Sequence, residues 1–167
     1  MDAFELIKTR RSIRKFTDEP VSDDIIYRVI ESGTWAPSGM NNQPWRFAVI
    51  RDNALKAEIS GLTHYSKIVK GANVLIAVFL DNSLSYDRTK DTQAIGACIQ
   101  NMLLYIHSIG LGAVWLGEIL KSKDRLIELV EGPKECELMA VIALGHPAEK
   151  GGRVSRKKSA DAVFFRK

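Results

Sequence analysis

The fold is organised by one stretch of sequence, Asp91-Thr-Gln-Ala-Ile-Gly-Ala-Cys-Ile-Gln-Asn-Met-Leu-Leu-Tyr-Ile-His-Ser108. Its spacing predicts the longest helix of the chain, ended by Gly110. Apolar residues fall on nearly every side of this helix, and the polar residues Gln93, Gln100 and His107 form only a thin stripe. A helix of this kind is typical of the centre of a core or of a subunit interface.

The segments on either side of this helix mix strand and helix patterns. Shorter helices are predicted over Asp2–Thr9, Asp23–Gly33, Asn53–Gly61 and Lys123–Glu131, and strands over Trp45–Ile50, Asn73–Leu80, Ala113–Leu116 and Leu138–Leu144. The order lacks strict βαβ alternation, which favours an α+β fold over a doubly wound one. No repeat or linker interrupts the chain, so residues 1–167 are predicted to form a single domain.

The composition is that of a soluble globular protein. Of the 167 residues, 46% are hydrophobic and 26% are charged, which excludes a disordered chain. The longest apolar runs, Val74–Leu80 and Leu138–Leu144, are far shorter than the roughly 18 residues of a membrane span. The first residues do not resemble a secretion signal, and Cys98 and Cys136 form no disulfide framework. These features predict a cytoplasmic protein without a membrane partner.

The net charge of +4 comes from basic residues near both ends of the chain. They are Lys8, Arg10, Arg11, Arg14 and Lys15 at one end, and Lys150, Arg153, Arg156, Lys157 and Lys158 at the other. Two separate clusters can converge on one compact anion as readily as they can follow a nucleic-acid groove. Because no nucleic-acid-binding motif accompanies them, we expect no nucleic-acid partner.

Two segments are candidate binding motifs. In Thr9-Arg-Arg-Ser-Ile-Arg-Lys-Phe16, guanidinium groups flank a hydroxyl, an arrangement that suits a phosphate. The alternative is a solvated charge run at a helix end. The loop from Ala36 to Trp45 carries amides, small residues and two flanking tryptophans that could bind and enclose a planar polar heterocycle. The alternative here is a long surface turn.

Other familiar motifs are absent from the sequence. Gly110-Leu-Gly112 follows a helix and precedes a strand, so it predicts a helix-ending turn and not a dinucleotide-binding fingerprint. Gly117 lies at a strand end, where a ligand can approach the backbone closely. There is no nucleophile elbow, no Walker A sequence and no pair of histidines at zinc-site spacing, so no metal site is predicted.

Several of these segments together resemble the nitroreductase family of FMN-dependent oxidoreductases. They are Arg10-Arg-Ser-Ile-Arg-Lys-Phe16, Ala36-Pro-Ser-Gly-Met-Asn-Asn-Gln-Pro-Trp45, Gln100-Asn-Met-Leu-Leu104, Gly110-Leu-Gly-Ala-Val-Trp-Leu-Gly117 and the basic tail. Their order and spacing match over essentially the whole chain. The resemblance implies an α+β homodimer with a mainly antiparallel central sheet flanked by helices. It also implies an exchanged C-terminal arm and one FMN in each of two interface clefts.

The resemblance assigns FMN-binding roles to fourteen positions. Arg10, Ser12 and a basic residue of the tail match the phosphate site; the tail residue is Arg156 or Arg153, with Lys157 as the alternative to both. Arg11 matches a contact to the phosphate or to the ribityl chain, while Arg14, and more loosely Lys67, match cations beside the flavin ring. Pro37, Ser38, Gly39 and Asn41 match a loop that reaches the flavin of the partner subunit. Leu116, Gly117 and Glu118 match the segment behind the ring, with backbone amides near its N5 and O4. No side chain is expected to be catalytic, and Arg14 is expected to stabilise reduced flavin.

The implied activity is hydride transfer from NADH or NADPH through flavin N5 to a small acceptor, such as a nitroaromatic compound or a quinone, by a ping-pong mechanism. The alternative is a flavin-binding protein used for storage or sensing, or for a specialised reaction such as dehalogenation or flavin cleavage. Only the short stretch Asp81–Lys90 separates a strand from the long helix. We therefore expect an open site that accepts many substrates.

Overall fold

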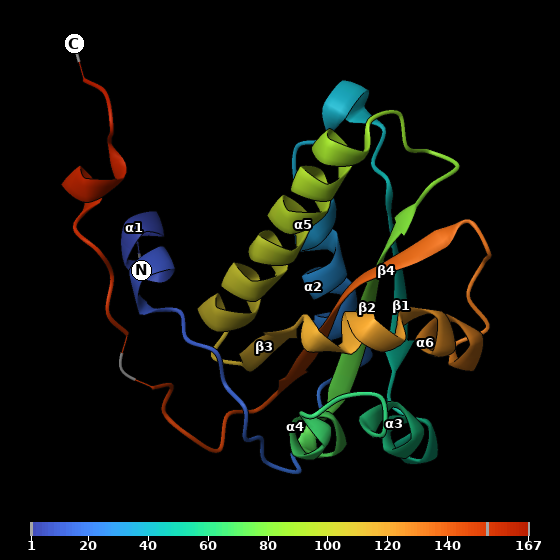
Figure 1. The fold of residues 1–167 in the computed structure, drawn as a ribbon. Helices are drawn as coiled ribbons and strands as arrows, with labels where there is room; N and C mark the ends of the chain where they lie inside the picture. Colours follow the sequence, from blue (N-terminus) through green and yellow to red (C-terminus); the bar gives the residue numbers. More distant parts are fainter. Residues whose placement is uncertain (1, 153, 167) are drawn as a thin grey trace.

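The computed structural model describes residues 2–152 and 154–166. Its centre is a sheet of four strands: β1 (Trp45–Ile50), β2 (Val74–Asp81), β3 (Gly112–Leu116) and β4 (Cys136–Gly145). They lie in the order β1-β2-β4-β3, and every neighbouring pair is antiparallel (Figure 1). The predicted α+β fold with a mainly antiparallel sheet is confirmed.

Helices cover both faces of this sheet. The helices on the sheet are α2 (Asp23–Thr34), α3 (Asn53–Ser60), α4 (Ser66–Gly71), α5 (Arg88–Ser108) and α6 (Lys123–Leu129), whereas α1 (Ala3–Thr9) lies away from it (Figure 1). Short 3₁₀ turns are η1 (Gly39–Asn41), η2 (Glu118–Ser122) and η3 (Ser159–Ala162). The helices α2 and α5 pack on one face of the sheet, and α3, α4 and α6 pack on the other. Strand β2 is therefore buried along its whole length.

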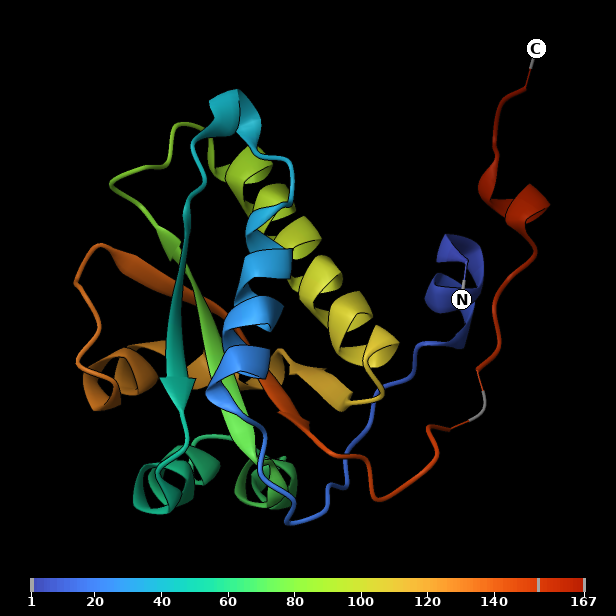
Figure 2. The ribbon, with the colours of Figure 1, turned by 180° about the vertical axis from the view of Figure 1, so that it is seen from behind.

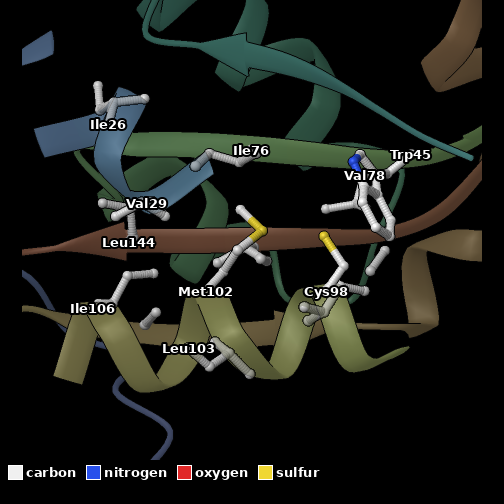
Figure 3. Packing of buried hydrophobic residues seen from close by; sticks show 14 of the residues in the cluster. Ile26, Val29, Trp45, Ile76, Val78, Cys98, Met102, Leu103, Ile106 and Leu144 are labelled. Carbon is white, nitrogen blue, oxygen red and sulfur yellow. The ribbon is translucent and has the colours of Figure 1, made fainter. Parts of the chain in front are cut away.

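The face under α2 and α5 holds the larger hydrophobic cluster (Figure 3). Met102 and Cys98 of α5 point toward Ile76 and Val78 of β2, while Val29 joins them from α2. Burying such side chains contributes roughly 1.5–3 kcal/mol each. The predicted central helix thus does lie on the core, although Gly96, Ala97 and Leu104 on its other side stay half-exposed.

The structure extends the predicted elements at three places. Helix α5 begins at Arg88, one turn before the predicted start, because the Asp87 side chain caps it by accepting a hydrogen bond from Lys90 N. Helix α4 was not predicted at all, and the loop after Ala36 contains the turn η1. Gly110, with φ of 82°, ends α5 in the left-handed conformation, which confirms the predicted helix-ending turn.

The two ends of the chain lie beside each other and project from the body (Figure 2). Helix α1 has no buried residue, and its Phe4 and Ile7 are largely exposed. The apolar end of the tail, Val163 to Phe165, is also largely exposed, so it is not buried against the described residues of its own chain.

Candidate cofactor-binding site

The segment from Arg10 to Thr17 crosses the end of the sheet as an extra, irregular strand. Ile13 N donates a hydrogen bond to Ala113 O of β3 at 2.9 Å, and Ser12 forms an isolated bridge with Ala113. Gly112 permits this approach, because a Cβ there would lie 2.7 Å from Ile13 Cβ. The backbone of the predicted phosphate motif is therefore fixed against β3.

The tail returns along the same segment. Ala148 N donates to Lys15 O at 2.9 Å, and a Cβ on Gly151 would lie 2.1 Å from Arg11 Cβ. The two basic clusters, which are more than a hundred residues apart in sequence, thus meet in space, which is the first of the two alternatives that their distribution left open.

Three guanidinium groups gather where the segments meet. Burial, together with the nearby charges of Arg11 and Arg156, lowers the pKa of Arg10. Among the residues that the structure describes, none of the three forms an ion pair with a carboxylate. We call this group, with Ser12, the cationic corner. These cations repel one another and form no ion pair within the described chain, so a bound anionic ligand would stabilise them.

A hollow of about 410 Å³ adjoins the cationic corner, lined among others by Thr9, Arg11, His107 and Lys150. His107 Nε2 lies 3.0 Å from Thr9 Oγ1. Burial and the charges of Arg10 and Arg11 lower the pKa of His107, so its ring is neutral at pH 7. The sequence had placed His107 only in the polar stripe or core of the long helix. Its position beside the predicted phosphate motif depends on a packing contact between α1 and α5.

Arg14 is held by its backbone while its guanidinium stays exposed. Its backbone N donates to Glu149 Oε1 at 2.8 Å, and its side chain donates to Ser12 O at 3.4 Å. Glu149 thus anchors the main chain and leaves the charge of Arg14 without a carboxylate partner among the described residues. This leaves the cation available to a ligand, in line with the role expected for it.

The end of β3 is open in front of Gly117. A Cβ placed on this glycine meets no atom within 4 Å, so the chain's own packing does not require glycine here. The next residue, Glu118, turns its side chain away to the loop before α4, where Oε2 accepts hydrogen bonds from Thr63 Oγ1 at 2.6 Å and His64 N at 3.1 Å. Hydrogen bonds from Lys121 and Thr63 lower the pKa of Glu118 to about 2. Its carboxylate is therefore a structural anion at pH 7.

The anchored loop leads into α4, whose first turn carries the exposed Lys67. Leu116, the last residue of β3, is buried. The strand end and the start of α4 are thus held together by Glu118, a link that the sequence analysis missed because Thr63 and Glu118 are far apart in sequence.

The predicted loop residues lie elsewhere. Pro37, Ser38 and Gly39 line a hollow of about 290 Å³ with Lys90 and Gln93, at the N-terminal end of α5. The cationic corner lies at the C-terminal end of the same helix, where Thr9 contacts His107. The 21 residues of α5 span about 30 Å. Within one chain, Pro37, Ser38, Gly39 and Asn41 therefore do not reach the other predicted site residues.

One predicted residue, Arg153, lies outside the residues that the structure describes. Within residues 2–152 and 154–166, no three His, Cys, Asp or Glu side chains are grouped closely enough to hold a metal ion. Over the same residues, no helix has the length and apolar character needed to cross a membrane.

The residues present fit FMN. The guanidinium groups of the cationic corner suit a phosphate, and the open space at Gly117 gives room for a flat ring beside the end of β3.

Comparisons with known proteins agree with this assignment. A model of the nitroreductase family matches residues 7–65 and 60–146. A solved Desulfovibrio desulfuricans protein, provisionally named a nitroreductase and in complex with FMN, is 45% identical with a TM-score of 0.94, covering 100% of this chain and 98% of its own.

Two curated relatives cover nearly the whole chain. A Methanothermobacter thermautotrophicus protein, provisionally named an NADH dehydrogenase/NAD(P)H nitroreductase, is 38% identical over 91% of this chain and 81% of its own length. The iodotyrosine deiodinase of Thermotoga neapolitana is 30% identical over 93% of this chain and 94% of its own. Sequence motifs, fold and comparisons lead to the same conclusion: this chain belongs to the nitroreductase family.

Proposed function

We propose that this chain is an FMN-dependent oxidoreductase that passes hydride from NADH or NADPH to a small organic acceptor by a ping-pong mechanism. The observation that carries the proposal is the cationic corner, a group of guanidiniums from the two ends of the chain that has no carboxylate partner among the described residues. Bound FMN would supply the hydride chemistry, and the protein would bind and orient it.

The cationic corner would hold the phosphate of the cofactor. Arg10 and Arg156 would offer charge-assisted hydrogen bonds, and Ser12 a hydroxyl, from a backbone already fixed against β3. The guanidinium of Arg11 already donates hydrogen bonds to Lys8 O and Arg10 O, so fewer of its donors are available to a phosphate. The contributions of Arg11 and Arg153 to phosphate binding remain predictions.

The end of β3 would hold the ring. The open space at Gly117 admits a flat ring against the backbone, and the Glu118 carboxylate, held by Thr63, stays out of that space. The exposed guanidinium of Arg14 and the exposed ammonium of Lys67 would stabilise the negative charge that reduction places on the ring.

A site completed by a second copy of the chain is part of the proposal. The loop from Pro37 to Gln43, the 37–43 loop, contacts α5 at Asp91, about 24 Å along the helix from His107 beside the cationic corner. It could therefore meet a flavin only in a partner subunit. A homodimer is further supported by the exposed apolar residues of α1 and the tail and by the half-exposed flank of α5 at Ala97 and Leu104. We propose that the apolar end of the tail packs on the partner as an exchanged arm.

The acceptor is proposed to be a nitroaromatic compound, a quinone or a similar small molecule. The connector from Asn82 to Asp87 is short and contains no helix of its own, which supports an open site and broad acceptor tolerance.

The decisive experiment is a visible absorption spectrum of FMN-loaded protein, recorded without oxygen before and after NADH or NADPH is added. Bleaching of the flavin bands by either nucleotide, and their return when a nitroaromatic compound or quinone is added, is the expected result. A protein that takes up no FMN, or activity that persists without FMN, would contradict the proposal.

The deiodinase relative favours one specialised alternative, reductive dehalogenation of a halogenated phenol. Chemically reduced, FMN-loaded protein would then release iodide from iodotyrosine. Absence of iodide release, with reoxidation by quinones intact, would leave the general oxidoreductase.

A further inference from the structure

Asp91 is a buried carboxylate that no cation neutralises among the described residues. It lies in the first turn of α5, and its relative exposure is 0%. Its Oδ1 accepts a hydrogen bond from Asn42 Nδ2 at 2.8 Å. Its Oδ2 accepts from Ser85 Oγ at 2.6 Å, Tyr86 N at 3.0 Å and Asp87 N at 3.1 Å. A buried charge is costly unless it is hydrogen-bonded, and here four donors offset that cost.

The charge state of Asp91 follows from these donors. Burial alone raises the pKa of Asp91, but the hydrogen bonds from Ser85, Asn42 and the backbone outweigh it and lower that pKa below its ordinary value. The side chain therefore stays an anion at pH 7 and accepts charge-assisted hydrogen bonds from two different segments of the chain.

One of these segments is the 37–43 loop, whose backbone is strained. Met40, Asn41 and Gln43 have φ values of 51°, 55° and 48°, and they are three of the four non-glycine residues with positive φ in the described structure. Strained backbone persists only where surrounding contacts over-determine it, and it clusters at functional sites. Inside the loop, Ser38 Oγ accepts from Gln43 N at 3.0 Å.

The loop is tied to the rest of the protein mainly through Asn42. Its Nδ2 donates to Asp91 and, at 3.0 Å, to Leu84 O, whereas its buried Oδ1 has no partner among the described residues. The Asn42 side chain is therefore oriented by its two donor contacts alone. In Figure 1 this loop, with η1, lies over the N-terminal end of α5.

The second segment held by Asp91 is the connector 82–87, which also contacts the loop directly. A Cβ on Gly39 would lie 1.9 Å from Tyr86 Oη, so the Tyr86 ring already occupies the space beside this glycine. The carboxylate thus joins the loop, the connector and α5 at one point.

We infer that Asp91 is a positioning residue that holds the 37–43 loop, through Asn42, in the shape that meets the flavin of a partner subunit. The inference rests on the proposed function, because the loop has a flavin to meet only if the protein binds FMN as a dimer. It adds a residue that belongs to none of the sequence motifs.

The test compares two single substitutions around the same carboxylate. Asn42→Ala removes the link between Asp91 and the loop. Ser85→Ala removes a hydrogen bond of similar length to Asp91 but leaves the loop attached. Both are measured for FMN dissociation constant, for visible circular dichroism of the bound flavin at saturation, and for kcat and KM with NADH and a quinone. Asp91→Asn is measured in the same way, with thermal melting to verify that it folds.

Asn42→Ala is expected to weaken FMN binding about tenfold and to change the circular dichroism of the flavin that remains bound, since a charge-assisted link is lost. Ser85→Ala is expected to stay within about twofold of the wild type. Equal effects of the two substitutions, or no change in the flavin signal for Asn42→Ala, would overturn the inference. The proposed function would still hold in that case if the flavin of the wild type bleaches with NADH. A wild type that binds no FMN would overturn both, and thermal melting separates either result from a loss of fold.

Discussion

The cationic corner and the 37–43 loop lie at opposite ends of α5 and are built by different means. The corner consists of charges that repel one another, and none of its arginines forms an ion pair with a carboxylate of the described residues. The loop carries little charge and is shaped by hydrogen bonds and by strained backbone at Met40, Asn41 and Gln43. Charge acts over several ångströms and tolerates small displacements, whereas a hydrogen-bonded loop acts only in one geometry. We therefore expect the corner to contribute most of the affinity for FMN, and the loop to contribute a smaller part of the affinity and to set the orientation of the flavin.

The largest effect is expected from mixing two defective chains. Arg10→Gln weakens the corner, and Gly39→Trp displaces the loop because Tyr86 fills the space at this glycine, so at an FMN concentration well below their dissociation constants neither variant alone binds FMN. If each site takes one region from each subunit, a mixed dimer contains one intact site. An equal mixture should then recover about one quarter of the FMN sites, measured by flavin absorbance after exchange of subunits. Mixed dimers that form, as verified by native mass spectrometry, and yet bind no FMN would show that the two regions do not share a site.

Removing one charge from the corner should have the next largest effect. Arg10→Gln deletes a charge-assisted contact to phosphate, and the FMN dissociation constant should rise about 10- to 100-fold. Fluorescence titration of FMN measures this. Arg125→Gln is the matched control, since Arg125 is an exposed arginine of α6 paired with Glu128. Similar losses for both variants would point to net charge and not to the corner.

A methyl group at the strand end tests the ring position. Gly117→Ala meets no protein atom within 4 Å, and φ of −101° suits alanine, so thermal stability should be unchanged or slightly higher. The methyl group would instead crowd a bound ring, at a cost of about 1 kcal/mol or roughly fivefold in the FMN dissociation constant. Unchanged FMN affinity in a calorimetric titration would show that the flavin ring does not bind beside Gly117.

The smallest effect is expected on the stability of the protein at acidic pH. The pKa of Glu118 is lowered to about 2 in the folded protein, against roughly 4.3 for an unperturbed glutamate. A lowered folded-state pKa stabilises the protein above the unfolded value and ceases to do so as pH falls through the folded one. Glu118→Gln should therefore lower the melting temperature at pH 7, and the difference from wild type should shrink between about pH 4.5 and pH 2. A difference that is independent of pH would mean that the carboxylate carries no such stabilisation.

Much of the fold was predictable because the core repeats a simple pattern. The apolar residues of β2 and α5 recur at strand and helix spacing, and these elements appear within a few residues of their predicted ends. Helix α4 escaped prediction because six residues, Ser66–Gly71, are too few for a periodic signal. The start of α5 was missed because its first turn, at Arg88, is polar and is fixed by the Asp87 cap.

The candidate site likewise has one part that the sequence predicted and one part that it did not. Motifs identified the cations and the loop, since arginines and a Pro-Ser-Gly run are visible in a single sequence. The links that position them were not visible. Asp91 stands alone in an apolar helix, and its partners Asn42 and Ser85 reach it only after the chain has folded. Glu118 and Thr63 meet in the same non-local way. The predicted roles of the fourteen residues toward FMN stay predictions.

The length of α5 has a thermodynamic consequence. Since α5 keeps the two regions of one chain about 24 Å apart, between Asp91 and His107, a lone chain offers FMN only part of its contacts under the proposed arrangement. Association of the subunits and uptake of the cofactor then share one coupling free energy, and each strengthens the other by the same factor. Dilution would release FMN, and an excess of FMN would hold the dimer together and raise its melting temperature. The cofactor would thus act as a concentration-dependent assembly factor as well as a redox group.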